Sequence, residues 1–131
     1  MGPGVLTGPF PRRDGVLHGG PHRLDELAER FGTPLYVYDL DAVEAAYRRF
    51  IDAFAGIPLD VAYSVKANGA LAVLHRLGSV GAGADIVSEG ELFRALRAGI
   101  PADRIVFAGV AKSEAEMEAA LRAGIRAFNV E

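Results

Sequence analysis

The residue best suited to covalent chemistry is Lys66, which ends the apolar stretch 59–66 and precedes a predicted helix. This pattern predicts a buried strand that delivers the lysine amine to its carboxyl end. In an α/β barrel that end of each strand faces the active site. An amine that is partly desolvated there has a lowered pKa and attacks carbonyl carbons to form a Schiff base. The alternative is a solvated lysine that merely ends a strand.

Small side chains surround this amine on the predicted strand. Period-two alternation places Ala62, Ser64 and Lys66 on the same face. If that face lines a barrel, the two small residues leave room for a flat ring beside the amine, where branched apolar residues are more usual. The alternative is that Ala62 and Ser64 pack against bulky neighbours.

Short apolar strands alternate with helical patterns from Leu59 onward. The strands start near Val61, Ala84, Ile105 and Ala127, about 22 residues apart. Such alternation predicts right-handed βα units and a parallel sheet. The pattern alone fits either the start of a closed barrel or one wing of an open, doubly wound sheet.

Two helices are predicted ahead of these units. The first covers residues 24–31, where apolar side chains fall on one face. The second is amphipathic and begins at a pair that resembles a capping box, Asp41 and Glu44. Residues 35–38 between the helices predict a strand, and residues 1–13, rich in glycine and proline, predict an irregular arm.

The bulk properties exclude several classes of protein. At 131 residues the chain suffices for one domain but is too short for a whole barrel of about 250 residues. A net charge of -3 with scattered basic residues argues against nucleic-acid or membrane partners. The absence of cysteine excludes disulfides and thiolate metal sites, and His18, His22 and His75 lack paired acids, so we expect no metal site. We expect no secretory leader, because the N-terminal residues lack a continuous apolar stretch, and no run approaches the ~20 apolar residues of a membrane span. The absence of cysteine fits the reducing cytoplasm.

Several ordered sequence blocks point to a family. The block Tyr63-Ser-Val-Lys-Ala-Asn68 resembles the lysine motif of the pyridoxal-phosphate (PLP) decarboxylases with an alanine-racemase-like barrel. One motif would be modest support, but further blocks resemble the same family in the same order. They lie at residues 32–39, 83–92, 105–112 and 128–131.

The resemblance implies an α/β fold, the N-terminal half of a (β/α)8 TIM barrel of the alanine racemase-like type, PLP fold type III. Residues 1–34 would form an arm with a short helix. Residues 35–58 would supply an entry strand, joining a second β-domain, and a helix. Residues 59–131 would form the first four βα units. We therefore expect the chain to be an N-terminal portion of a longer protein.

The resemblance also implies the site. Pyridoxal 5'-phosphate would be the cofactor, and Lys66 the catalytic residue that holds it as a Schiff base. Asp85, in a predicted buried strand, would lie near the ring and the amine; the alternative is an aspartate bonded to backbone donors. Glu91 is a further cofactor-binding candidate, although a capping box with Ser88 explains it better. The same spacing at residues 113–116 is given only a structural role.

Within this family the decarboxylases that act on meso-diaminopimelate match best. The implied reaction is the PLP-dependent decarboxylation of meso-diaminopimelate to lysine, in lysine biosynthesis. The resemblance also implies a cytoplasmic enzyme that forms a homodimer and binds a small amino-acid substrate. The alternatives are another amino-acid or polyamine decarboxylase or racemase, a non-catalytic PLP-binding barrel, or an inert fragment. The family's phosphate-binding, ring-stacking and pyridine-nitrogen residues do not map onto this chain, so we expect the isolated 131 residues to be inactive.

Overall fold

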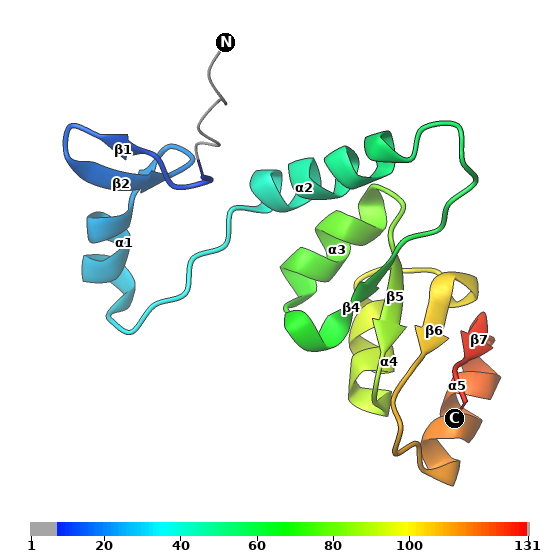
Figure 1. Ribbon diagram of the computed structural model, residues 1–131. Coiled ribbons are helices and arrows are strands. Elements are labelled where there is room, and N and C mark those ends of the chain that lie inside the picture. The colour runs from blue at the N-terminus through cyan, green and yellow to red at the C-terminus, as the bar shows by residue number, and fades with distance from the viewer. Residues whose placement is uncertain (1–7, 131) are drawn as a thin grey trace. The chain divides into compact units, whose positions relative to one another are not determined.

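The computed structural model describes residues 8–130, and the chain divides into two compact units, Met1–Ala42 and Val43–Glu131. The first seven residues of the predicted arm lie outside the described residues. In the first unit a small antiparallel sheet of three strands precedes a helix (Figure 1). Its elements are β1 (Arg12–Arg13), β2 (Val16–Gly19), β3 (His22–Arg23) and α1 (Leu24–Phe31).

The helix α1 confirms the prediction for residues 24–31, and the sheet before it was not predicted. Strands of two to four residues are too short to show an alternating pattern. The turn between β1 and β2 holds Asp14 and Gly15 at positive φ, 49° and 82°. Only the last two residues of the predicted arm, 12–13, are in a strand, and residues 12–23 together form two tight hairpins.

The strand predicted over residues 35–38 is wrong for the described chain. These residues pair with no strand among residues 8–130, and Tyr36 and Tyr38 are 85% and 54% exposed. A strand needs a neighbour for its backbone groups, and the sequence pattern does not identify that neighbour. That these residues join a second β-domain stays a prediction.

The start of the second helix, α2 (Leu40–Ala53), also differs from the prediction. Asp39 caps it, because its Oδ1 accepts from the backbone N–H groups of Asp41 and Ala42 at 3.0 Å each. Glu44, predicted as the other half of a capping box, instead forms ion pairs with Arg48 and Arg76. The helix itself is confirmed, and its cap lies two residues earlier than predicted.

The second unit contains a parallel sheet with the strand order β4-β5-β6-β7. Each new strand is added beside the previous one, whereas a doubly wound sheet reverses its order at a switch point. The predicted βα units and the barrel type of winding are confirmed. The strands are β4 (Ala62–Ser64), β5 (Gly83–Ile86), β6 (Ile105–Phe107) and β7 (Ala127–Phe128), and the helices are α3 (Leu71–Ser79), α4 (Glu89–Arg97) and α5 (Glu114–Ala123).

The core of this unit lies between the sheet and its helices, which cover one face (Figure 1). Ile105 and Phe107 of β6 and Ala84 and Ile86 of β5 are all fully buried on that face. Alternate strand residues, including Asp85, point to the other face, which no helix of the described chain covers. Ser88 caps α4 and Ser113 caps α5, where it forms the complete capping box that was predicted.

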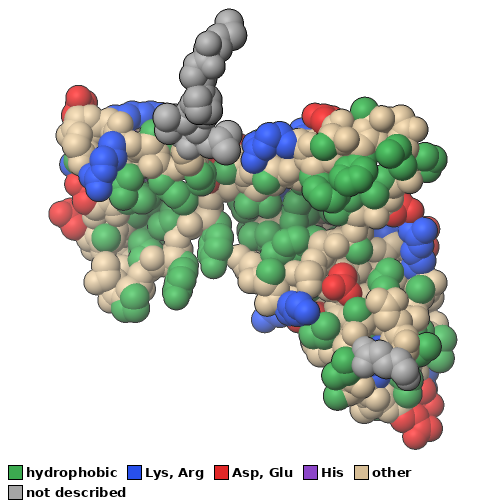
Figure 2. Space-filling model, in the orientation of Figure 1, with side chains coloured by type: hydrophobic (Ala, Val, Ile, Leu, Met, Phe, Trp, Pro, Cys, Tyr) green, Lys and Arg blue, Asp and Glu red, His purple; other side chains and the backbone are tan. Residues whose placement is uncertain are grey.

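The edge of β4 adjoins an apolar surface. Figure 2 shows hydrophobic side chains gathered over α2 and the turn that follows it, where Phe50 on the helix is 49% exposed, and Phe54 and Ile57 after it are 39% and 62% exposed. Between α2 and β4 lies an open hollow of about 400 Å³. It is lined by Val43, Ala46, Tyr47, Phe50, Val61, Ala62, Tyr63, Ser64 and Leu77.

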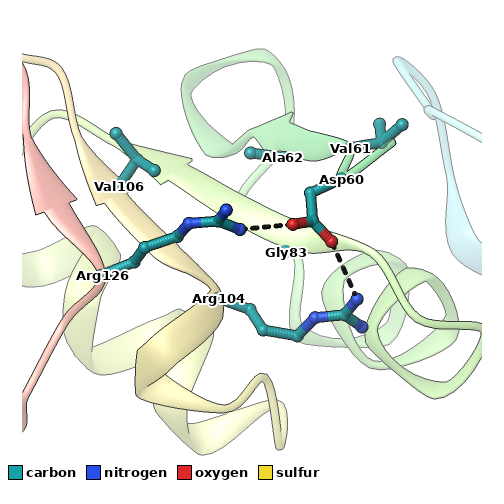
Figure 3. A pocket seen from close by; sticks show the side chains of 7 residues that line it. All are labelled: Asp60, Val61, Ala62, Gly83, Arg104, Val106 and Arg126. Carbon is teal, nitrogen blue, oxygen red and sulfur yellow. Dashed lines mark hydrogen bonds and ion pairs between the residues drawn. The ribbon is translucent and has the colours of Figure 1, made fainter. Parts of the chain in front are cut away.

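Ion pairs connect the amino ends of β4, β6 and β7, at the end of the sheet away from Lys66. Asp60 lies between two guanidinium groups, and accepts from Arg126 at 2.6 Å and from Arg104 at 3.3 Å (Figure 3). Arg104 precedes β6 directly, Arg126 precedes β7, and Asp60 lies two residues before β4. The hydrogen bond from Arg126, with its charge and a second bond from Arg104, lowers the pKa of Asp60.

This cluster predicts a specific loss of stability in acid. A carboxyl group whose pKa is lower in the folded than in the unfolded chain stabilises the fold above its ordinary pKa, and this contribution is lost as the pH falls through the folded value. We expect Asp60→Asn to reduce the free energy of unfolding at neutral pH. The difference from the unmodified chain should shrink below about pH 4. Urea titrations between neutral pH and acid measure it.

Asp52→Asn is the matched control, since the Asp52 side chain forms no ion pair with residues 8–130. It should leave the pH profile unchanged. An Asp60→Asn profile parallel to that of the unmodified chain would contradict the assigned role.

Candidate active site

Lys66 lies directly beyond the carboxyl end of β4, as predicted, but outside the strand. The strand ends at Ser64, and Val65–Ala67 form a single 3-10 turn, η1. Val65 is 1% exposed and packs into the core, while Lys66 is exposed. The Lys66 ammonium forms no hydrogen bond or ion pair with any residue between 8 and 130. The turn therefore presents a lysine without partners at this end of the sheet.

The expected partial desolvation of Lys66 is wrong for the described chain. Burial of the amine would require further strands or helices across the sheet face that faces away from α3, α4 and α5. Among residues 8–130 nothing covers Lys66, so water reaches the side chain. The sequence motif specifies the position of the lysine in the chain, but its burial depends on tertiary neighbours.

Ser64 and Asp85 are direct partners in the β4–β5 pairing. Asp85 in turn pairs with Val106, so the three side chains form a row on the face away from the helices. Both Ser64 Oγ and Asp85 Oδ1 are buried, and neither has a hydrogen-bond partner among residues 8–130. The alternative in which backbone donors satisfy this oxygen of Asp85 is not observed. The turn η1, with Lys66, also contacts β5.

Glu91 lies in the first turn of α4, at the carboxyl end of β5. Ser88 caps this helix, and its Oγ accepts from the Glu91 N–H at 3.2 Å. Glu91 Oε2 accepts from the N–H of Val87 at 2.8 Å, rather than from Ser88 as in a standard capping box. The predicted structural role is thus confirmed with a shifted partner, and a role in cofactor binding stays a prediction.

Lys112 holds the carboxyl ends of β6 and β7 together, and sequence reasoning missed it. Its Nζ donates to the carbonyl oxygen of Gly109 and, at 2.6 Å, to that of Asn129. The same ammonium lies 5.7 Å from the centre of the Phe107 ring. Gly109 is tightly packed, since a Cβ there would lie 2.8 Å from the Val87 oxygen. No local sequence pattern predicts these hydrogen bonds, because one acceptor is 17 residues away in the chain.

Removal of the Lys112 ammonium should loosen this edge of the site. We expect Lys112→Met to lower the free energy of unfolding by about 1–2 kcal/mol, because two carbonyl groups lose their donor. Lys112→Arg, which keeps donors and charge, should retain most of the stability. Urea denaturation measures the loss, and hydrogen exchange of residues 108–113 should accelerate in the Met variant alone. Equal stability of the Met variant and the unmodified chain would contradict this role.

The residues at the carboxyl ends of β4 and β5 fit the ring end of pyridoxal phosphate. The Lys66 amine has no partner in the described part of the chain and is chemically able to condense with an aldehyde. The unpartnered oxygens of Ser64 and Asp85 would accept donors from a polar ring, or in the case of the hydroxyl also donate. The arrangement therefore supplies an amine, a carboxylate and a hydroxyl on neighbouring strands.

Solved structures share this fold. The chain matches the diaminopimelate decarboxylase of M. jannaschii, solved in complex with L-lysine, with a TM-score of 0.88 and 40% identity over 95% of this chain and 30% of that chain. It matches the lysine/ornithine decarboxylase of Vibrio vulnificus, solved with cadaverine, with a TM-score of 0.75 and 28% identity over 82% of this chain and 29% of that chain. These similarities confirm the predicted half of an alanine-racemase-like barrel.

Curated relatives agree with the structural comparison. The chain is 51% identical to the diaminopimelate decarboxylase of Pseudomonas fluorescens over 122 residues, 93% of this chain and 29% of that protein. It is 52% identical over 105 residues to the protein of the same name from Neisseria meningitidis serogroup B, which covers 80% of this chain and 25% of that protein. The chain thus spans less than a third of the length of these relatives.

The family follows from a match over most of the chain. The family model described as pyridoxal-dependent decarboxylase, pyridoxal binding domain, matches residues 40–131. The chain belongs to this family of pyridoxal-dependent decarboxylases. Within the described residues, no helix has the length and apolar character needed to cross a membrane.

Proposed function

We propose that this chain supplies the cofactor-attaching part of a PLP-dependent decarboxylase that converts meso-diaminopimelate to lysine. The observation that carries the proposal is the exposed amine of Lys66 just beyond the carboxyl end of β4, which is bonded to no residue from 8 to 130. It stands in a chain that belongs to the pyridoxal-dependent decarboxylases. The choice of substrate rests on relatives named diaminopimelate decarboxylase at 51% and 52% identity.

Lys66, Asp85 and Glu91 have different proposed roles in the reaction. When bound, pyridoxal phosphate supplies the electron sink that loss of a carboxylate as CO₂ requires. Lys66 would hold the cofactor covalently, and its amine, when free, would move a proton at the reacting carbon. The Asp85 carboxylate would orient the cofactor from the neighbouring strand. Glu91, already bonded to Val87, would contribute negative charge at the end of β5.

The proposal extends to assembly and location. A homodimer in the cytoplasm is proposed from the resemblance to the family, and a small amino acid is the proposed partner. A second candidate substrate set is lysine or ornithine, because the Vibrio vulnificus enzyme has the same fold with a TM-score of 0.75. Its lower identity, 28% against 40% for the M. jannaschii enzyme, favours diaminopimelate.

Attachment of the cofactor to Lys66 can be tested directly. Lys66 and Lys112 are the only lysines in the sequence, so only two side-chain amines compete for the aldehyde. We expect incubation with pyridoxal phosphate and borohydride reduction to label Lys66, because the Lys112 ammonium is bonded to two carbonyl groups. Peptide mass spectrometry locates the label. Lys66→Ala should abolish the specific label, and Lys112→Arg should retain it.

Catalysis can be tested in a chimera. Residues 1–131 would replace the aligned part of the Pseudomonas fluorescens enzyme, which shares 51% of its residues with this chain. We expect the chimera to release CO₂ from meso-diaminopimelate and Lys66→Ala in the chimera to abolish this release. The isolated chain should release none, because its sheet leaves Lys66 open to water. Full activity of the Ala chimera would refute the role of Lys66, and activity on ornithine alone would refute the substrate.

A further inference from the structure

Ser64 is a half-buried residue whose hydroxyl oxygen is buried, and neither a helix cap nor the family resemblance gives that hydroxyl a role. We propose that Ser64 is a further cofactor-binding residue, which together with Asp85 forms the polar surface on which the pyridoxal ring binds. This inference rests on the proposed function, because it requires pyridoxal phosphate to bind at the carboxyl ends of β4 and β5.

The register of the sheet brings the two side chains together. Ser64 and Asp85 are paired across the parallel β4–β5 ladder, so both project from the same face. The row continues through Val106 and Ala127, which are apolar. Lys66 follows Ser64 by two residues in a turn that contacts β5. A hydroxyl and a carboxylate therefore lie side by side next to the reactive amine.

The hydrogen-bonding state of both residues indicates a ligand. Ser64 Oγ and Asp85 Oδ1 are buried without partners, and they are the two such side-chain atoms identified among residues 8–130. Buried polar atoms in folded proteins nearly always find a partner, and exceptions mark functional positions or bound groups. The coincidence of both exceptions in one paired position makes simple packing a poor explanation.

The two groups are complementary to a ring that carries both donors and acceptors. An ionised carboxylate only accepts hydrogen bonds, whereas a hydroxyl both donates and accepts. The pyridoxal ring carries a nitrogen that accepts a proton and a hydroxyl beside its aldehyde. Asp85 would accept from the ring hydroxyl, and Ser64 would donate to an oxygen or accept from a second donor.

A purely structural role for Ser64 makes a different prediction. Ser64 also lines the apolar hollow between α2 and β4. If its hydroxyl were only a small filler, Ser64→Ala would leave cofactor binding unchanged. If the hydroxyl is reserved for a ligand, its removal relieves an unsatisfied group in the free chain and weakens the complex. The ligand-binding role thus predicts opposite effects on stability and on affinity.

The experiment measures both quantities in the full 131-residue chain. Ser64→Ala should raise the melting temperature of the ligand-free chain and weaken the binding of pyridoxal 5'-phosphate about 3- to 10-fold. Pyridoxine 5'-phosphate, which has no aldehyde and does not link to Lys66, should lose affinity by a similar factor. Spectral titration and equilibrium dialysis give the dissociation constants.

Two further variants make the test decisive. Ser64→Thr keeps the hydroxyl and should restore most of the affinity, which a filling role would not require. Ser79→Ala is the matched control, because the exposed Ser79 hydroxyl donates to the Arg76 carbonyl on α3. The affinity of the Ser79→Ala chain for both probes should stay unchanged. Unchanged affinity of Ser64→Ala, with Lys66 still labelled in the unmodified chain, would overturn the role of Ser64. Absence of label at Lys66 in the unmodified chain would instead overturn the proposed function, and this inference with it.

Discussion

The parallel pairing of β4 with β5 is the constraint on which the candidate site depends. It sets Ser64 beside Asp85 and leaves the turn with Lys66 against the same neighbouring strand. The pairing is stabilised because the other face of β5 is buried under the helices, where Ala84 and Ile86 are fully inaccessible to water, and Tyr63 of β4 packs against the same core. A slip of one residue would exchange the two faces of a strand. The hydrophobic core therefore determines which polar groups face the open side of the sheet.

The two ends of the sheet are held by different interactions. At the amino ends, Asp60 joins three strands through two arginines, which is where barrel folds keep residues that serve stability. At the carboxyl ends, Lys112 joins the segments after β6 and β7 through carbonyl groups. Lys112, the other lysine of the chain, is used to hold strand ends together, whereas Lys66 is bonded to none of the described residues. This contrast supports a chemical role for Lys66 over a structural one.

Membership in the pyridoxal-dependent decarboxylases gives this contrast its chemical meaning. The cofactor of this family, pyridoxal phosphate, carries an aldehyde group. Within residues 8–130, the structure places an amine without partners beside two oxygens that have no hydrogen-bond partner. The open face of the sheet is consistent with a chain that spans 29% of the Pseudomonas fluorescens relative. A barrel site is enclosed by all of its strands, so water exclusion is a property of the closed barrel and not of four βα units.

The sequence by itself determined most of the helices and parallel strands and the position of the candidate reactive lysine among them. Helix caps such as Ser113, the alternation of strands with helices, and the position of Lys66 after a strand all depend on residues close in the chain, so they were predictable. The burial of Lys66, the hairpins of residues 12–23 and the partners of Lys112 were not. Each depends on groups that meet only after folding, or on strands too short to leave a pattern. Tertiary structure alone decided that Ser64 and Asp85, 21 positions apart, would share one unsatisfied polar surface.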